Sequence, residues 1–170
     1  MYAGRILKQK GIIELIDCFN ILSKKYNNIY LHIAGDGNLL ENLKDNNKNS
    51  RIKFYGKLDF ESLCNLYSKT NIFVYAPKWP EGLPTGILEA GLMECAVISS
   101  PQGGITEIID DKENGIMINS DEQLLSNMEL LIKNSDLRLK FGKRLKEKVL
   151  KNFCWKNTIN TIIKDIESNK

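Results

Sequence analysis

The chain has 170 residues, of which 42% are hydrophobic and 26% charged, with a formal net charge of +3. This length is sufficient for one domain with a substantial hydrophobic core, and the composition excludes a disordered or fibrous protein. A weak, dispersed positive charge gives no basis for nucleic-acid binding, and no apolar run approaches the length of about 18 residues typical of a membrane-spanning helix.

Strand-like and helix-like segments alternate along the chain. The opening residues MYAGR have the character of a strand end running into a loop, and 11–26 carries apolar residues at helical spacing. The remaining predicted strands are 29–35, 51–56, 71–77, 96–100 and 115–119. The remaining predicted helices are 38–46, 59–70 with Asp59 as its N-cap, 84–95, 105–110, 121–134, 135–152 and a C-terminal helix over 155–170.

Strands separated by helical crossovers predict an α/β fold: a Rossmann-like parallel sheet of about six strands with helices on both faces. Ligands of such sheets bind beyond the carboxyl ends of the strands. Four glycine- or proline-rich loops follow strands and are expected at that edge, namely 4–11, 35–38, 78–84 and 101–104. We interpret 1–170 as a single domain, and the opening on a strand end suggests a piece of a longer protein.

The ten residues EGLPTGILEA, 81–90, place two carboxylates around a predicted helix start. Pro84 suits the first helical position, so the N–H groups of Thr85, Gly86 and Ile87 are expected to lack intrahelical partners and to form an anion site. Glu89 lies one turn beyond Thr85, within reach of hydroxyl groups beside a bound anion. Glu81 precedes the helix and is expected to face the anion's other side. This pattern predicts a sugar-nucleotide site, because a carboxylate is a good acceptor for a diol.

Arg5 and Lys10 flank the loop after the first strand, and Lys8 lies between them. An arginine fork and a lysine point charge are suited to stabilising a departing diphosphate. The sequence contains no Asp-x-Asp pattern, the common carboxylate site for a divalent ion. We therefore predict neither metal nor cofactor at this site.

Several other groups have a structural and a functional interpretation. Gly35-Asp36-Gly37 is either a tight turn or a ligand-facing turn, and it is not a G-x-G-x-x-G fingerprint because Leu40 replaces the third glycine. Gly103-Gly104 could approach a ligand in the same way. His32, the only histidine, is expected in the core or on a sheet face. The widely spaced cysteines are expected to be reduced, mostly buried thiols of a cytoplasmic protein, and they are Cys18, Cys64, Cys95 and Cys154.

The chain resembles the C-terminal, nucleotide-binding half of a GT-B glycosyltransferase of the retaining family 4, also called glycosyl transferases group 1. The resemblance runs nearly end to end. The segments that carry it are YAGRILKQKG, LHIAGDGNLLENL, IKFYGKLDFESLCNLYSKTNIFVYAP, the E-x7-E motif EGLPTGILEA, AVISSPQGGITEII and NFCWKNT.

The resemblance implies roles for residues of these motifs. Arg5 and Lys10 would hold the donor diphosphate, Glu81 would contact the donor sugar, and these three are the predicted catalytic residues. Glu89 would bind the ribose hydroxyls of a UDP-sugar or GDP-sugar. The remaining predicted donor-binding positions are Gly4, Gly35, Gly37, Gly82, Leu83, Pro84, Thr85 and Gly86.

The resemblance also implies that the acceptor, a glycan or a lipid, binds an N-terminal domain absent from this sequence. The chain alone would then bind the donor without transferring the sugar, and the full-length enzyme could associate with the inner face of the membrane. An alternative is a separate, non-catalytic nucleotide-sugar-binding subunit that needs a partner chain. A degenerate structural domain is a third possibility, which the presence of Arg5, Lys10, Glu81 and Glu89 disfavours.

Overall fold

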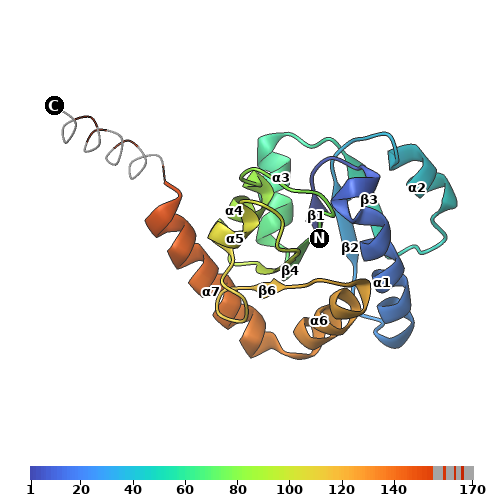
Figure 1. Cartoon of the computed structure of the whole chain (residues 1–170). Helices are drawn as coiled ribbons and strands as arrows, with labels where there is room; N and C mark the ends of the chain where they lie inside the picture. Colours follow the sequence, from blue (N-terminus) through green and yellow to red (C-terminus); the bar gives the residue numbers. More distant parts are fainter. Residues whose placement is uncertain (155–158, 160–162, 164–165, 167–170) are drawn as a thin grey trace.

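The computed structural model of the protein describes residues 1–154 and positions 159, 163 and 166 (Figure 1). The predicted helix over 155–170 lies outside the described residues except at those three positions. Within the described range, the strands are β1 (Tyr2–Ala3), β2 (Leu31–Ala34), β3 (Ile52–Gly56), β4 (Ile72–Tyr75), β5 (Ala96–Ser99) and β6 (Ile116–Met117). The helices are η1 (Lys8–Lys10), α1 (Ile12–Lys25), α2 (Leu40–Asn46), α3 (Phe60–Ser68), α4 (Thr85–Leu92), α5 (Ile105–Ile108), α6 (Asp121–Lys133) and α7 (Ser135–Asn152).

The strands form two parallel three-stranded sheets, β1-β2-β3 and β4-β5-β6. The two sheets adjoin at β1 and β4, where the Met1 amino group donates to the Ile72 carbonyl (2.7 Å) and the Val74 N–H donates to the Met1 carbonyl (2.9 Å). The strands therefore follow the spatial order β3-β2-β1-β4-β5-β6. The predicted Rossmann-like arrangement is confirmed, and the order reverses between β1 and β4, which is the switch point where ligands bind in such folds.

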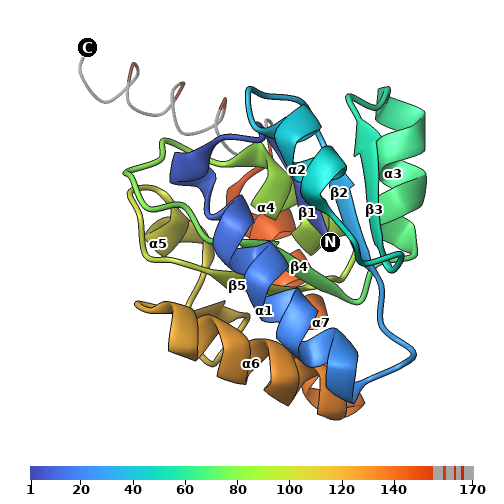
Figure 2. The same ribbon diagram turned by 90° about the vertical axis from the view of Figure 1, so that its right-hand side faces the viewer.

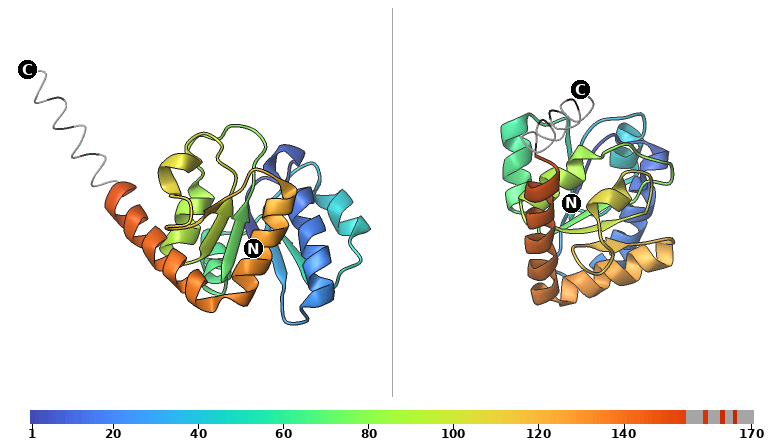
Figure 3. Two further views of the ribbon diagram at one scale, coloured as in Figure 1. Left: turned by 60° about the horizontal axis from the view of Figure 1, so that its bottom comes forward. Right: turned by 60° about the vertical axis from the view of Figure 1, so that its left-hand side comes forward.

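Helices cover both faces of this arrangement. α1 packs against α6 on one face, and α4 packs against α7 on the other, as Figures 2 and 3 show from different sides. All four residues of β5 are buried, as expected for a strand with helices on both sides. Among the described residues, no helix has both the length and the apolar character that crossing a bilayer requires.

Most predicted elements are present with ends shifted by a few residues. Asp59 caps α3 as predicted, since its carboxylate accepts from the Ser62 N–H at 2.7 Å. The prediction for 84–95 was wrong at both ends. Pro84 has an extended backbone and precedes the helix, and α4 stops at Leu92, shortly before Glu94, which adopts a left-handed conformation (φ 58°). The chain thus turns sharply into the buried strand β5.

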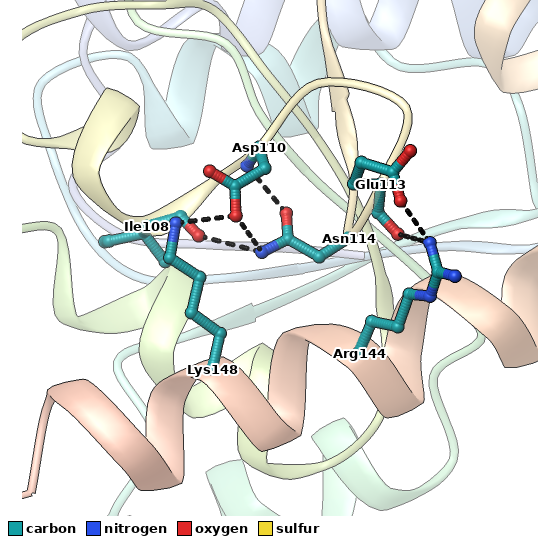
Figure 4. Close-up of polar contacts among 6 residues, drawn as sticks. All are labelled: Ile108, Asp110, Glu113, Asn114, Arg144 and Lys148. Atoms are coloured by element: carbon teal, nitrogen blue, oxygen red, sulfur yellow. Dashed lines mark hydrogen bonds and ion pairs between the residues drawn. The ribbon is translucent and has the colours of Figure 1, made fainter.

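The loop between α5 and β6 is closed on itself by a buried asparagine and joined to α7 by two ion pairs (Figure 4). The Asn114 amide donates to the Ile108 carbonyl (3.1 Å) and accepts from the Asp110 N–H (2.8 Å). Lys148 pairs with Asp110 at 2.8 Å, and Arg144 pairs with Glu113. The central asparagine is 3% exposed, so its hydrogen bonds close the loop in a place that water scarcely reaches.

Candidate functional site

A cavity of about 390 Å³ opens at the carboxyl ends of β1 and β4, where the strand order reverses. This volume is in the range of small-molecule sites. Loops from both three-stranded sheets contribute to it, so the site spans the junction between them. Its lining residues are Ala3, Gly4, Arg5, Lys10, Leu63, Tyr67, Tyr75, Glu81, Leu83, Pro84, Thr85, Gly86, Ile87 and Glu89.

The loop after β1 supplies the two cations predicted for the site. Arg5 is exposed, and within the described part of the chain its guanidinium group has no acidic partner. Lys10 ends the short helix η1 and is 6% exposed, whereas Lys8 is exposed and does not line the cavity. The lysine facing the cavity is therefore Lys10, and its ammonium group forms an ion pair with Glu81.

The start of α4 lines the cavity and carries two free backbone N–H groups. Thr85 and Gly86 have no acceptor for their N–H groups among the described residues. The prediction that Ile87 would also offer a free N–H was wrong, because that group donates to the Pro84 carbonyl at 3.0 Å. Two adjacent free donors at the positive end of a helix dipole are chemically suited to an anionic group.

Glu89 lies half-buried in the same cavity, one turn into α4. Its neighbour Tyr67 comes from α3 and is 1% exposed. The Tyr67 hydroxyl donates to the Gly86 carbonyl at 3.3 Å. Burial raises the pKa of Tyr67 above its usual value, and the adjacent Glu89 carboxylate raises it further. The hydroxyl therefore stays protonated, and it fixes the first turn of α4 against α3.

Two stacked tyrosines lie on the other side of the cavity, and Tyr75 is the one that lines it. The rings of Tyr2 and Tyr75, from β1 and β4, lie 5.9 Å apart. The Tyr2 hydroxyl donates to the Arg5 carbonyl at 2.6 Å, and burial raises the pKa of both tyrosines above the usual value. The carboxylate of Glu81 also raises the pKa of Tyr75, by its charge and by hydrogen bonding to the hydroxyl. Both rings thus act as neutral supports for the residues above them.

The Gly35-Asp36-Gly37 turn lies directly under the loop that carries Arg5. A Cβ atom on Gly35 would lie 1.8 Å from the Gly4 carbonyl oxygen, and one on Gly37 would lie 2.3 Å from the Ile6 carbonyl oxygen. The Ile6 N–H also donates to the Asp36 carbonyl at 2.8 Å. The turn is therefore a close support for the loop, and Gly35 additionally lines a neighbouring hollow.

The Gly103-Gly104 pair supports the other loop of the site. A Cβ atom on Gly103 would lie 2.0 Å from the Glu81 carbonyl oxygen, and one on Gly104 would lie 2.3 Å from that of Gly82. The Gly104 N–H donates to the Glu81 carbonyl at 3.1 Å. These glycines thus approach protein backbone closely, beneath the residues predicted to contact the ligand. Gly82 itself is exposed and does not line the cavity.

Other singled-out residues lie away from the cavity. His32 is on β2, and its Nδ1 lies 2.8 Å from the Tyr55 hydroxyl, so the expected position on a sheet face is confirmed. The four cysteines are free, two of them buried and two half-buried. In the described part of the chain, no group of three or more His, Cys, Asp or Glu residues could hold a metal ion.

Sequence reasoning missed the three tyrosines that support the site. Tyr2 and Tyr75 each lie close before a glycine- or proline-rich loop that follows a predicted strand. That position could have indicated them, although their stacking depends on the pairing of β1 with β4. Tyr67 has the position of an ordinary residue on the apolar face of a helix. Nothing in the sequence around it indicates its contact with α4.

Comparisons with known proteins agree with this geometry. The chain is 32% identical over 172 residues to an uncharacterized glycosyltransferase of Methanocaldococcus jannaschii, an alignment that covers 98% of the chain and 44% of the relative. It is 26% identical to the capsular polysaccharide biosynthesis glycosyltransferase CapM of Staphylococcus aureus, covering 98% of the chain and 47% of that protein. The chain thus spans less than half the length of these relatives.

Solved structures show the same fold. The C-terminal domain of LpcC from Francisella tularensis, a glycosyl transferase group 1 family protein, superposes with a TM-score of 0.79 at 28% identity, covering 91% of this chain and 85% of that one. Anabaena HepE, solved in complex with UDP-glucose, has a TM-score of 0.82 at 19% identity, covering 99% of this chain and 48% of that one.

The fold and the cavity at its switch point define a Rossmann-like domain of the type found as the C-terminal half of GT-B glycosyltransferases. The sequence model described as glycosyl transferases group 1 matches residues 1–148. The chain belongs to this glycosyltransferase family.

Proposed function

We propose that the chain is the donor-binding domain of a retaining glycosyltransferase of family 4, which transfers a sugar from a nucleotide-diphosphate sugar to a glycan or lipid acceptor. The observation that carries this proposal is the convergence of four side chains and the start of α4 in one cavity. Arg5, Lys10 and the free N–H groups of α4 offer positive charge and donors, while Glu81 and Glu89 offer carboxylates on either side of them.

Each group has a role that follows from its chemistry. The Thr85 and Gly86 N–H groups and the cations Arg5 and Lys10 would hold the diphosphate. Glu89, next along α4, would accept hydrogen bonds from the ribose diol. A neighbouring hollow of about 350 Å³ has a mostly apolar lining that includes Leu58 and Leu63, and it suits the flat base. HepE, which shares the fold, was solved with UDP-glucose.

The proposed reaction breaks the bond between the sugar's anomeric carbon and the diphosphate oxygen. The acceptor hydroxyl attacks on the same face, its oxygen forms the new glycosidic bond, and its proton passes to the departing phosphate. Arg5 and Lys10 stabilise the charge that develops on the leaving group. In this proposal no divalent ion takes part. The acceptor is bound by an N-terminal domain outside this sequence, so the chain alone binds donor without transfer.

Thermal unfolding with UDP, GDP, ADP and CMP tests the donor site. A nucleotide at about 100 times its dissociation constant adds about 2.7 kcal/mol to the unfolding free energy, which raises the Tm by several degrees. We expect a shift with one diphosphate in the presence of EDTA, and its loss in Arg5→Ala and Glu89→Ala. The matched controls are Arg144→Ala and Glu41→Ala, which remove exposed charges outside the cavity. Absence of any shift in the wild-type chain would contradict the proposal.

A further inference from the structure

The cavity contains a pair of opposite charges that neutralise each other before any ligand arrives. The Lys10 ammonium group is bonded to a Glu81 carboxylate oxygen, and the two side chains are 7% and 14% exposed. They come from loops 71 residues apart in sequence, each held in place by a close glycine turn. A pair so well shielded from water is screened little by salt. Its two charges therefore affect how strongly the cavity binds a charged ligand.

We propose that Glu81 makes the site discriminate between donor and product, by lowering its affinity for a bare diphosphate relative to a diphosphate that carries a sugar. This inference rests on the proposed function. Its physical basis is competition: a phosphate that approaches Lys10 must either displace Glu81 or bind beside its negative charge. Either event weakens binding, because the pair is lost or a like charge is brought close.

Donor and product differ in how they meet this carboxylate. In the donor, the sugar hydroxyls can donate hydrogen bonds to Glu81 and so compensate for the disturbed ion pair. In the product, the terminal phosphate takes up an additional negative charge, since its second pKa is about 6. That charge lies on the side from which the sugar has departed, which is the side of Glu81. The carboxylate therefore favours the donor and promotes release of the nucleotide diphosphate.

The variant Glu81→Gln tests this directly, because it keeps the shape of the side chain and removes the charge. Binding of UDP, UDP-glucose and inorganic pyrophosphate is measured by calorimetry, with pyrophosphate as a probe of the diphosphate site that needs no base or sugar. We expect UDP and pyrophosphate to bind about tenfold more tightly to the variant, the scale of one charge interaction near a protein surface, while UDP-glucose gains nothing. Unchanged or weaker binding of pyrophosphate would overturn the inference.

Three further variants test whether the charge of Glu81, rather than its shape or the net charge of the protein, is responsible for the difference. Glu81→Asp keeps the charge and should bind pyrophosphate within about twofold of the wild type. Glu94→Gln removes a carboxylate that is paired with Lys146 on the surface, so it changes the net charge equally. It should leave the binding of UDP, UDP-glucose and pyrophosphate unchanged. In a Lys10→Gln background the Glu81 carboxylate is no longer neutralised and repels a phosphate directly, so Glu81→Gln should tighten pyrophosphate binding by at least about tenfold there. No gain in that background, or the same gain in Glu94→Gln as in Glu81→Gln, would contradict the role of the Glu81 charge.

Failure of the inference and failure of the proposed function are distinguishable. If no nucleotide stabilises the wild-type chain, the assignment of the donor site is refuted. The pyrophosphate measurement still decides whether Glu81 lowers the affinity of the cavity for a diphosphate. If nucleotides bind and Glu81→Gln does not tighten UDP, the donor site stands and the discrimination by Glu81 is refuted.

Discussion

Gly103 lies immediately behind Glu81, with its absent Cβ position only 2.0 Å from the Glu81 carbonyl oxygen. The residue also has φ 58°, a conformation that L side chains rarely adopt. A side chain at this position would therefore both strain its own backbone and push the glutamate loop out of the cavity. The double-glycine loop thus sets the position of a carboxylate more than twenty residues before it in the chain.

Gly103→Ala should lower the unfolding free energy by more than about 2 kcal/mol, since strain and a steric clash add. It should also weaken the binding of UDP-glucose. Gly56→Ala is the matched control, because Gly56 has a similar φ of 67° but nothing within 4 Å of its Cβ position. Strain alone should then lower stability by about 1 kcal/mol. Urea unfolding measures the stability of both variants. Equal losses of unfolding free energy in Gly103→Ala and Gly56→Ala would refute the contact of Gly103 with Glu81.

Tyr2→Phe removes the hydroxyl that donates to the Arg5 carbonyl. Loss of this bond, which leaves a carbonyl with one acceptor site unused, should reduce the unfolding free energy by about 1 kcal/mol. Because the carbonyl belongs to the residue that carries the cation, UDP binding should weaken as well. Tyr30→Phe, on an exposed ring, is the control for urea unfolding and calorimetry. A Tyr2→Phe variant with wild-type affinity for UDP would show that this bond does not position Arg5.

Glu129→Gln should destabilise the protein at pH 7 but not at low pH. Hydrogen bonds from Lys25, Tyr26 and Lys133 hold the pKa of Glu129 at about 2, against an ordinary value of 4.5. A depressed carboxyl pKa contributes stability that is present above the ordinary value and lost as pH falls through the folded one. The difference between variant and wild type in urea unfolding should therefore shrink as the pH is lowered from about 5 towards 2.

A difference that stays constant over this pH range would indicate that the glutamate contributes through packing rather than charge. Glu41→Gln is the control for the change in net charge, since Glu41 forms an exposed pair with Lys44 within α2. Its unfolding midpoint relative to the wild type should change little with pH, as expected for an exposed pair on one helix.

Asn114→Ala should reduce stability by about 2 kcal/mol, because it leaves the Asp110 N–H and the Ile108 carbonyl without their buried partner. Arg144→Met removes a neighbouring ion pair at the surface of the same loop and should lower the unfolding free energy by less than about 1 kcal/mol. The two variants are compared by urea unfolding. A larger loss in Arg144→Met would mean that the ion pair to α7 contributes more to the stability of this loop than the buried asparagine does.

The class of fold and the main cavity residues could be predicted from the sequence because they depend on local patterns. Alternating strand and helix periodicities define a parallel sheet, and its carboxyl edge gathers the loops that follow the strands. That reasoning alone brings Arg5, Lys10, Glu81 and Glu89 to one edge, and the structure places all four around one cavity. Pro84 was misplaced by one residue, an error typical of helix ends.

What could not be predicted depends on contacts between distant segments. The pairing of Lys10 with Glu81 and the stacking of Tyr2 on Tyr75 require the distance between β1 and β4, which no local pattern contains. The same holds for Gly35 and Gly103. Their residue type indicated a close approach, but whether a ligand or another backbone segment occupies the space depends on the packed structure.

The junction between the two three-stranded sheets has a consequence for folding. Arg5 and Lys10 belong to the first sheet's loops, whereas Glu81 and Glu89 belong to the second, so neither half can form the cavity alone. Contacts between segments this far apart in sequence tend to form late, after local helices and strands. The cavity should therefore be among the last features to form during refolding, and a fluorescent nucleotide that binds it would report the docking of β1 against β4.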